Sequence, residues 1–214
     1  MWISPRRACS PSLTTISMFK ILSVTNRHLC RENFAERTRK IARAGADGII
    51  LREKDLEEGA YQALSREVLD GCGDKLILHS FPEVALNLKI SRIHLPLPLL
   101  RSLSENQRQK FTVLGASCHS LHDVQEAESL GCTYVTLGHI FATDCKKGLP
   151  PRGLAFLEDV AKNTRLPVYA IGGIGRDNIR LIREAGASGA CIMSGLMVCE
   201  DPRKELECLR NSLK

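Results

Sequence analysis

Short apolar segments of strand length alternate with amphipathic segments of helix length along the chain from Met18 onward. This alternation predicts repeated strand–helix units arranged around a parallel sheet. The segments that predict strands cover eight ranges, namely residues 21–24, 48–51, 75–78, 92–95, 112–116, 134–137, 167–171 and 190–193. The segments that predict helices include residues 33–44, 60–70, 82–88, 121–130, 153–162, 176–185 and 202–213.

Glycines mark the ends of several predicted helices. Gly45, Gly131 and Gly186 each stand between a helical stretch and the next strand, where glycine commonly ends a helix. Eight strand–helix units in a chain of 214 residues predict a single-domain α/β fold, the TIM (β/α)8 barrel, because closure leaves no strand edge exposed. The alternative is an open doubly wound sheet. That fold usually has a glycine-rich turn after its first strand, and residues 24–28, Val-Thr-Asn-Arg-His, do not form one.

Residues 1–17 differ in composition from the rest of the chain. They contain no acidic residue, the adjacent pair Arg6 and Arg7, two prolines and six serines or threonines, and they show no hydrophobic periodicity. They also lack the apolar stretch of a secretory signal. We expect a disordered leader or an upstream translation start over residues 1–17, and the barrel domain over residues 18–214.

Charge and cysteine content narrow the class of protein. The net charge is +6, but aromatic residues make up only 5% of the chain and no basic run is interleaved with them, which argues against a nucleic-acid surface. No stretch approaches the length of a membrane-spanning helix. The nine cysteines are scattered without a C-x-x-C pair, so a disulfide framework and a zinc site are disfavoured. We expect a cytoplasmic protein with a small anionic ligand.

The loops after the last two predicted strands are rich in glycine. In TIM barrels, active sites lie at the carboxyl ends of the strands, and the loops after strands seven and eight commonly bind phosphate. Glycine allows backbone N–H groups to approach phosphate oxygens. The alternative is that these glycines only permit tight turns, but their paired location favours a phosphate site made by Gly172, Gly173, Met193, Ser194 and Gly195.

The loop after the sixth predicted strand carries the most reactive groups. His139 directly follows the strand, and histidine is suited to proton transfer near neutral pH. An isolated histidine would more often cap a loop carbonyl. Here the same loop also supplies candidate anion-binding groups at Thr143 and Lys146, which favours a functional role for His139.

The remaining strand ends are less informative. Arg52 and Lys54 follow the second strand and could reach an anionic substrate, although an ion pair involving Glu53 is an equal alternative. After the fifth strand, Ser117 is a candidate ligand contact and His119 a structural hydrogen-bonding residue. For His79 and His94, which end strands three and four, packing is the simpler interpretation; the histidine spacing supports no metal site.

Five strand-end segments together resemble one family. Residues 18–210 resemble the thiamine phosphate synthase/TenI superfamily in Leu-Arg-Glu-Lys at 51–54, Gly-Ala-Ser-Cys-His at 115–119, Gly-His-Ile-Phe-Ala-Thr at 138–143, Ala-Ile-Gly-Gly-Ile at 170–174 and Met-Ser-Gly at 193–195. The resemblance implies a TIM barrel that binds a thiazole phosphate, and a homodimer would fit this family.

Two branches of this superfamily differ at the strand ends. Synthases carry an Ile-Asn-Asp-Arg motif after strand three and an aspartate-containing segment after strand four, which serve a pyrimidine pyrophosphate and its magnesium. This chain has Leu-His-Ser-Phe at 78–81 and His-Leu-Pro-Leu-Pro at 94–98, and Gly-His at 138–139 where synthases have Gly-Pro. Residues 138–149 look closely like the TenI branch, the thiazole tautomerases.

Membership of the TenI branch implies an isomerase without metal or cofactor. Its substrate would be a dearomatised 2-carboxy-4-methylthiazole bearing an ethylidene phosphate, and its product the aromatic thiazole phosphate carboxylate. His139 would move the proton, and the loop residues Thr143, Asp144, Cys145 and Lys146 would bind the thiazole carboxylate or close over it. The alternatives are a thiamine phosphate synthase and a non-catalytic regulator that binds a thiazole phosphate.

Overall fold

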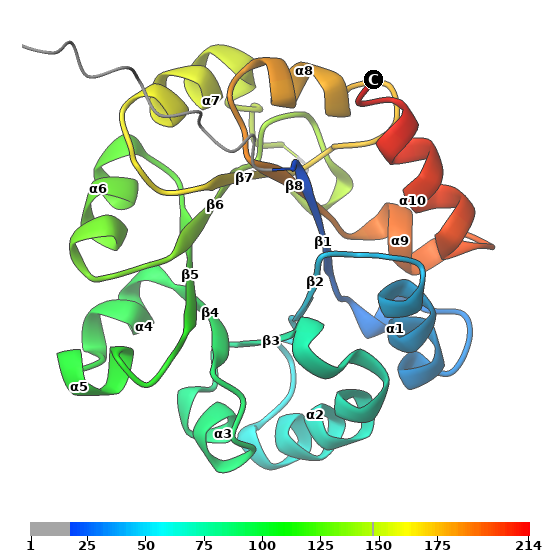
Figure 1. Cartoon of the computed structure of the whole chain (residues 1–214), viewed down its shortest axis with the longest axis vertical. Coiled ribbons are helices and arrows are strands. Elements are labelled where there is room, and N and C mark those ends of the chain that lie inside the picture. Colours follow the sequence, from blue (N-terminus) through cyan, green and yellow to red (C-terminus); the bar gives the residue numbers. More distant parts are fainter. Residues whose placement is uncertain (1–17, 147) are drawn as a thin grey trace, which may run out of the picture.

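The computed structural model describes residues 18–146 and 148–214, which form a closed barrel of eight parallel strands inside a ring of helices (Figure 1). Each strand pairs with its neighbours in the chain, and the last strand pairs with the first, for example Ile21 with Ala190. The strands are β1 (Lys20–Val24), β2 (Gly48–Leu51), β3 (Leu76–His79), β4 (Arg92–Pro96), β5 (Val113–Cys118), β6 (Tyr134–Gly138), β7 (Val168–Ile171) and β8 (Gly189–Ile192).

The helices surround the strands on the outside of the barrel (Figure 1). None of those in the described ranges is long and apolar enough to cross a membrane. They are α1 (Phe34–Arg43), α2 (Glu58–Cys72), α3 (Pro82–Asn87), α4 (Leu97–Ser102), α5 (Glu105–Arg108), α6 (Leu121–Ser129), α7 (Gly153–Lys162), α8 (Ile179–Glu184), α9 (Ser194–Val198) and α10 (Pro202–Asn211), with 3₁₀ turns at Arg27–Leu29, Gly73–Lys75 and Asp144–Lys146.

Successive strand residues face opposite sides of the sheet, which gives the barrel two apolar layers. Ile21 and Ile49 belong to the large cluster between strands and helices. Leu22 and Ile50 belong to a second cluster that fills the barrel interior together with Tyr134 and other side chains. Because side chains fill this interior, ligand space is expected at the ends of the strands.

The predicted TIM barrel is confirmed, and the strand bounds differ from the predicted ones by at most two residues. Helix α8 begins at Ile179, three residues later than predicted, because residues 172–178 form the turns that leave β7. Helices α4, α5 and α9 are not predicted from the pattern. Each is only four to six residues long, which is too short for a helical period to emerge. The predicted leader lies outside the described residues.

Candidate functional site

A cavity of about 450 Å³ opens at the carboxyl ends of the strands. Its volume is typical of a small-molecule site, and its position is that of TIM-barrel active sites. Ten of the thirteen predicted site residues line it: Arg52, Lys54, Ser117, His139, Thr143, Lys146, Gly172, Gly173, Met193 and Ser194.

Three predicted residues do not appear in the wall of this cavity. Asp144 has an exposed side chain, and Gly195 is the second residue of α9. Cys145 belongs to the turn Asp144–Lys146, and its side chain lies outside what the structure describes. The cavity is also lined by residues outside the predicted set, among them the polar side chains of Asn26, His79 and His119.

His139 directly follows β6 and is half-buried in the cavity wall. Its Nε2 lies 3.3 Å from the carbonyl oxygen of Leu149, and its own carbonyl accepts from the N–H of Arg152 at 3.0 Å. Because a carbonyl oxygen only accepts, Nε2 carries the proton of the neutral ring. The lone pair is therefore on Nδ1, and this is the atom that can take a proton from a substrate.

Two glycines of the β7 loop pack directly against the β6 loop. Gly172 has φ +101° and Gly173 has φ +65°, both in the left-handed region. A Cβ at Gly172 would lie 2.4 Å from the Cβ of His139, and one at Gly173 would lie 2.3 Å from the carbonyl oxygen of Ala142. No side chain fits at either position, so the two glycines determine how closely the β7 loop supports His139.

Three basic side chains, Arg52, Lys54 and Lys146, line the cavity. The positive charge of Arg52 is the main cause that lowers the pKa of Lys54, followed by partial burial and the charge of Lys146. Like charges held together in this way favour an anionic ligand. Among the described residues, no aspartate or glutamate lines the cavity.

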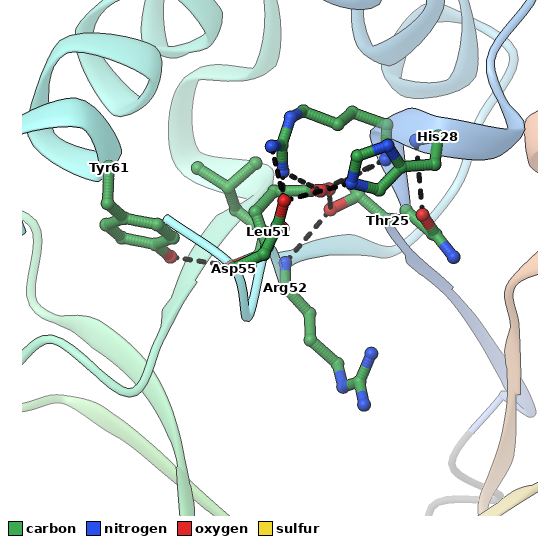
Figure 2. A network of polar contacts seen from close by, with 9 residues as sticks. Thr25, His28, Leu51, Arg52, Asp55 and Tyr61 are labelled. Atoms are coloured by element: carbon green, nitrogen blue, oxygen red, sulfur yellow. Dashed lines mark hydrogen bonds and ion pairs between the residues drawn. The ribbon is translucent and has the colours of Figure 1, made fainter. Parts of the chain in front are cut away.

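The segment that carries Arg52 and Lys54 is held by buried Glu53. Glu53 Oε1 accepts a hydrogen bond from the Thr25 hydroxyl at 2.6 Å, and its carboxylate also accepts from the Arg27 N–H and guanidinium. The same Thr25 hydroxyl oxygen accepts from the Arg52 N–H at 2.9 Å. Glu53 and Thr25 thus join the ends of β1 and β2, while the Arg52 side chain extends away from the network in Figure 2.

An exposed ion-pair cluster continues this network outward. Arg27 makes two hydrogen bonds of 2.6 Å to the Asp55 carboxylate, and His28 Nε2 lies 3.0 Å from the same group. The hydrogen bond from Arg27, followed by that from His28, holds the pKa of Asp55 well below its usual range. His28 therefore has a partner that its sequence neighbours do not reveal.

Two buried histidines, His79 and His94, lie close enough to these cations to be affected by their charge. Burial first, then the charges of Arg52 and Lys54, lower the pKa of His79 to about 3. Burial likewise holds the pKa of His94 well below its ordinary value. His94 bonds to the Tyr134 hydroxyl at 3.0 Å and the Ser117 hydroxyl at 2.9 Å. Both histidines are neutral at pH 7, so they supply hydrogen-bonding groups to this part of the barrel but no charge.

The comparison with known proteins identifies the family. The family described as "Thiamine monophosphate synthase" matches residues 21–196, most of the barrel. The chain belongs to this family. The resemblance to the thiamine phosphate synthase/TenI superfamily, seen in the strand-end residues, is confirmed. This superfamily belongs to thiamine biosynthesis.

Two relatives and one solved structure are similar to this chain over nearly their whole length. Thiamine-phosphate synthase of Syntrophomonas wolfei is 30% identical over 204 residues, covering 91% of this chain and 96% of the relative. That of Desulfitobacterium hafniense is 30% identical over 194 residues, covering 86% and 92%. The structure of thiamine phosphate pyrophosphorylase from Pyrococcus furiosus superimposes with a TM-score of 0.78 at 27% identity, covering 92% of this chain and 96% of that one.

Proposed function

We propose that this protein is a cytoplasmic thiazole tautomerase of thiamine biosynthesis. It converts the dearomatised 2-carboxy-4-methylthiazole ethylidene phosphate into the aromatic thiazole phosphate carboxylate. The observation that carries the proposal is the composition of the cavity, where His139 and three cations meet no carboxylate of the described residues. The seven cysteines whose side chains are described are all free thiols, which fits a reducing compartment.

The residues present do not fit the magnesium site that a synthase requires. Magnesium prefers carboxylate oxygens, and the ends of β3 and β4 contribute His79 and Pro96 to the cavity instead. The carboxylate of Glu53 lies beside Arg52 and Lys54 in sequence, but it is buried and accepts bonds from Thr25 and Arg27. No group of three or more metal-ligating side chains exists within residues 18–146 and 148–214.

The phosphate and carboxylate of the proposed substrate complement the positive charge of the basic side chains that line the cavity. Its phosphate would lie on the loops after β7 and β8, against Gly172, Gly173 and Ser194, with Met193 and Gly195 shaping the loop. Its carboxylate would lie near Lys146 and Thr143. This arrangement places a dianionic phosphate and a carboxylate in a cavity whose charged lining groups are basic, and it holds the thiazole between them.

The reaction needs only proton transfer. His139 Nδ1 takes the proton from the ring carbon that bears the carboxylate, and the exocyclic carbon receives a proton as the ring becomes aromatic. A well-placed general acid–base contributes roughly 10²–10⁴-fold to such a step. Aromatisation provides the driving force, so no leaving group has to be stabilised.

Thiamine phosphate synthesis is the second candidate, because the relatives at about 30% identity are named thiamine-phosphate synthase. In that reaction Arg52 and Lys54 would face the pyrophosphate of the pyrimidine substrate. A regulator that binds a thiazole phosphate without turnover is the third candidate.

One set of incubations distinguishes the three functions. Purified protein is mixed with the dearomatised thiazole carboxylate phosphate, with and without EDTA, and aromatic thiazole absorbance is followed. EDTA-insensitive conversion supports the tautomerase. Coupling of thiazole phosphate to the pyrimidine pyrophosphate only with magnesium supports the synthase instead, and product binding without either turnover supports the regulator.

A substitution tests the assigned base. His139→Asn should abolish isomerisation while binding of the aromatic product, measured by calorimetry, remains within about threefold of wild type. His122→Asn is the matched control, because His122 is exposed on α6 and should leave turnover unchanged. Near wild-type turnover by His139→Asn would overturn the assignment.

A further inference from the structure

A second histidine, His119, lies in the same cavity wall as His139. It follows the end of β5, the strand adjacent to β6, and both residues line the cavity of about 450 Å³. Both also line a neighbouring cavity of about 490 Å³ formed with the residues 149–152. Both residues therefore lie where the two cavities adjoin.

The hydrogen bonds of His119 determine which ring nitrogen is basic. Its Nδ1 lies 3.0 Å from the carbonyl oxygen of Gly138, the residue immediately before His139, and so donates to it. Its backbone N–H donates to the Asp123 carboxylate at 2.7 Å, which anchors the residue at the start of α6. Within the described part of the chain, no protein group bonds to Nε2, which is left to exchange a proton with a ligand.

Two histidines in one wall suit the proposed tautomerisation, on which this inference rests, because that reaction moves protons at two different carbons. A proton leaves one carbon of the substrate and another arrives at a different carbon. A single imidazole would have to serve both carbons in turn. Two imidazoles in one wall allow each carbon to have its own proton carrier.

We propose that His119 is a second catalytic residue, which donates the proton to the exocyclic carbon. His139 Nδ1 takes the proton from the ring carbon, and the electron pair of the broken C–H bond joins the aromatic system. The electron pair of the exocyclic double bond forms the new C–H bond with the proton from imidazolium Nε2 of His119. His139 ends as imidazolium and His119 as neutral imidazole, and proton exchange with water restores both.

A positioning role through the Gly138 carbonyl is the competing explanation, and one substitution separates the two. In His119→Asn the side-chain amide nitrogen takes the place of Nδ1 and keeps the bond to Gly138, but Nε2 is lost. We expect kcat of isomerisation to fall at least 100-fold with KM within about threefold of wild type. A kcat of His119→Asn within about threefold of wild type would overturn the catalytic role. His122→Asn is again the matched control.

Isotope transfer gives a second measurement that does not depend on a variant folding. Substrate carrying deuterium on the ring carbon is converted by the wild-type protein in ordinary water. Separate proton carriers predict product without deuterium on the former exocyclic carbon. Deuterium found there by mass spectrometry would mean that one group carried the same hydrogen across, and would overturn the inference.

The two proposals fail in different ways. If the wild-type chain does not convert the dearomatised substrate, the tautomerase proposal fails and the role of His119 fails with it. If the wild-type chain converts the substrate and His119→Asn does so equally well, only the role of His119 fails.

Discussion

Replacing Gly172 with alanine perturbs the support of His139 directly. The left-handed backbone at Gly172 costs an alanine about 1–3 kcal/mol. The new Cβ would lie 2.4 Å from His139 Cβ and 2.8 Å from His139 Cα, so the two loops have to separate. Overpacking of this kind adds about 1–3 kcal/mol. The expected loss of stability is therefore about 2–6 kcal/mol.

Gly131→Ala provides the matched control for backbone strain. Gly131 also has a positive φ, +84°, but a Cβ there meets nothing within 4 Å. This variant should lose only the backbone contribution, about 1–3 kcal/mol, and keep its activity. At about 2–4 °C per kcal/mol for a chain of this size, the two variants should differ by several degrees in melting temperature.

Activity provides the decisive readout for Gly172→Ala. A shift of His139 by about 1 Å is enough to cost about 100-fold in rate. We therefore expect kcat of isomerisation, measured by thiazole absorbance below the melting temperature, to fall by about that factor. Equal stability of Gly172→Ala and Gly131→Ala, together with equal kcat, would show that the β7 loop does not support the histidine.

Three further outcomes follow from the buried polar groups. Glu53→Gln weakens the hydrogen bonds from Thr25 and Arg27, so it should lower the free energy of unfolding in urea by about 1–3 kcal/mol. It should also raise KM more than it lowers kcat, and an unchanged KM would contradict the role of Glu53 in holding the loop after β2. In the unfolded chain His79 and His94 are protonated near pH 6.5, whereas in the fold the pKa of His79 is about 3 and that of His94 is also lowered. The free energy of unfolding should therefore fall as the pH decreases from about 6.5 toward 3, by up to about 1.4 kcal/mol per pH unit for each histidine. His79→Gln should flatten this decrease in urea titrations at different pH values, and an unaltered slope would refute the assignment. Burial raises the pKa of Cys118 and Cys191 to about 12, so mass spectrometry should find both unlabelled by iodoacetamide in the folded protein and labelled in urea; rapid labelling of the folded chain would contradict their burial.

The sequence predicts most of the barrel because its signals are local. Apolar runs define the strands, and Gly45, Gly131 and Gly186 all adopt the positive φ expected where helices end. The cavity residues are predictable for a related reason. Closure of the barrel brings all eight strand ends to one rim, so residues such as Arg52 and His139 meet although they are distant in the chain.

The partners of buried polar groups are not predictable in this way. The sequence allows Glu53 to form an ion pair with Arg52 or Lys54, but its carboxylate accepts hydrogen bonds from Thr25 and Arg27 across the β1–β2 junction. That contact depends on strand register and on the fact that successive residues point to opposite sides. The bond from His119 to Gly138 depends likewise on how β5 and β6 are aligned.

The pairing of β1 with β8 has a consequence for synthesis of the protein. Lys20 lies beside Gly189 in the finished barrel, so the first strand leaves the ribosome long before its partner has been translated. Until then, the nascent sheet has two unpaired edges that can join another chain. Truncations that remove β8 should therefore aggregate rather than yield a smaller active protein, since the rim that carries the chemistry is completed only by the last strand.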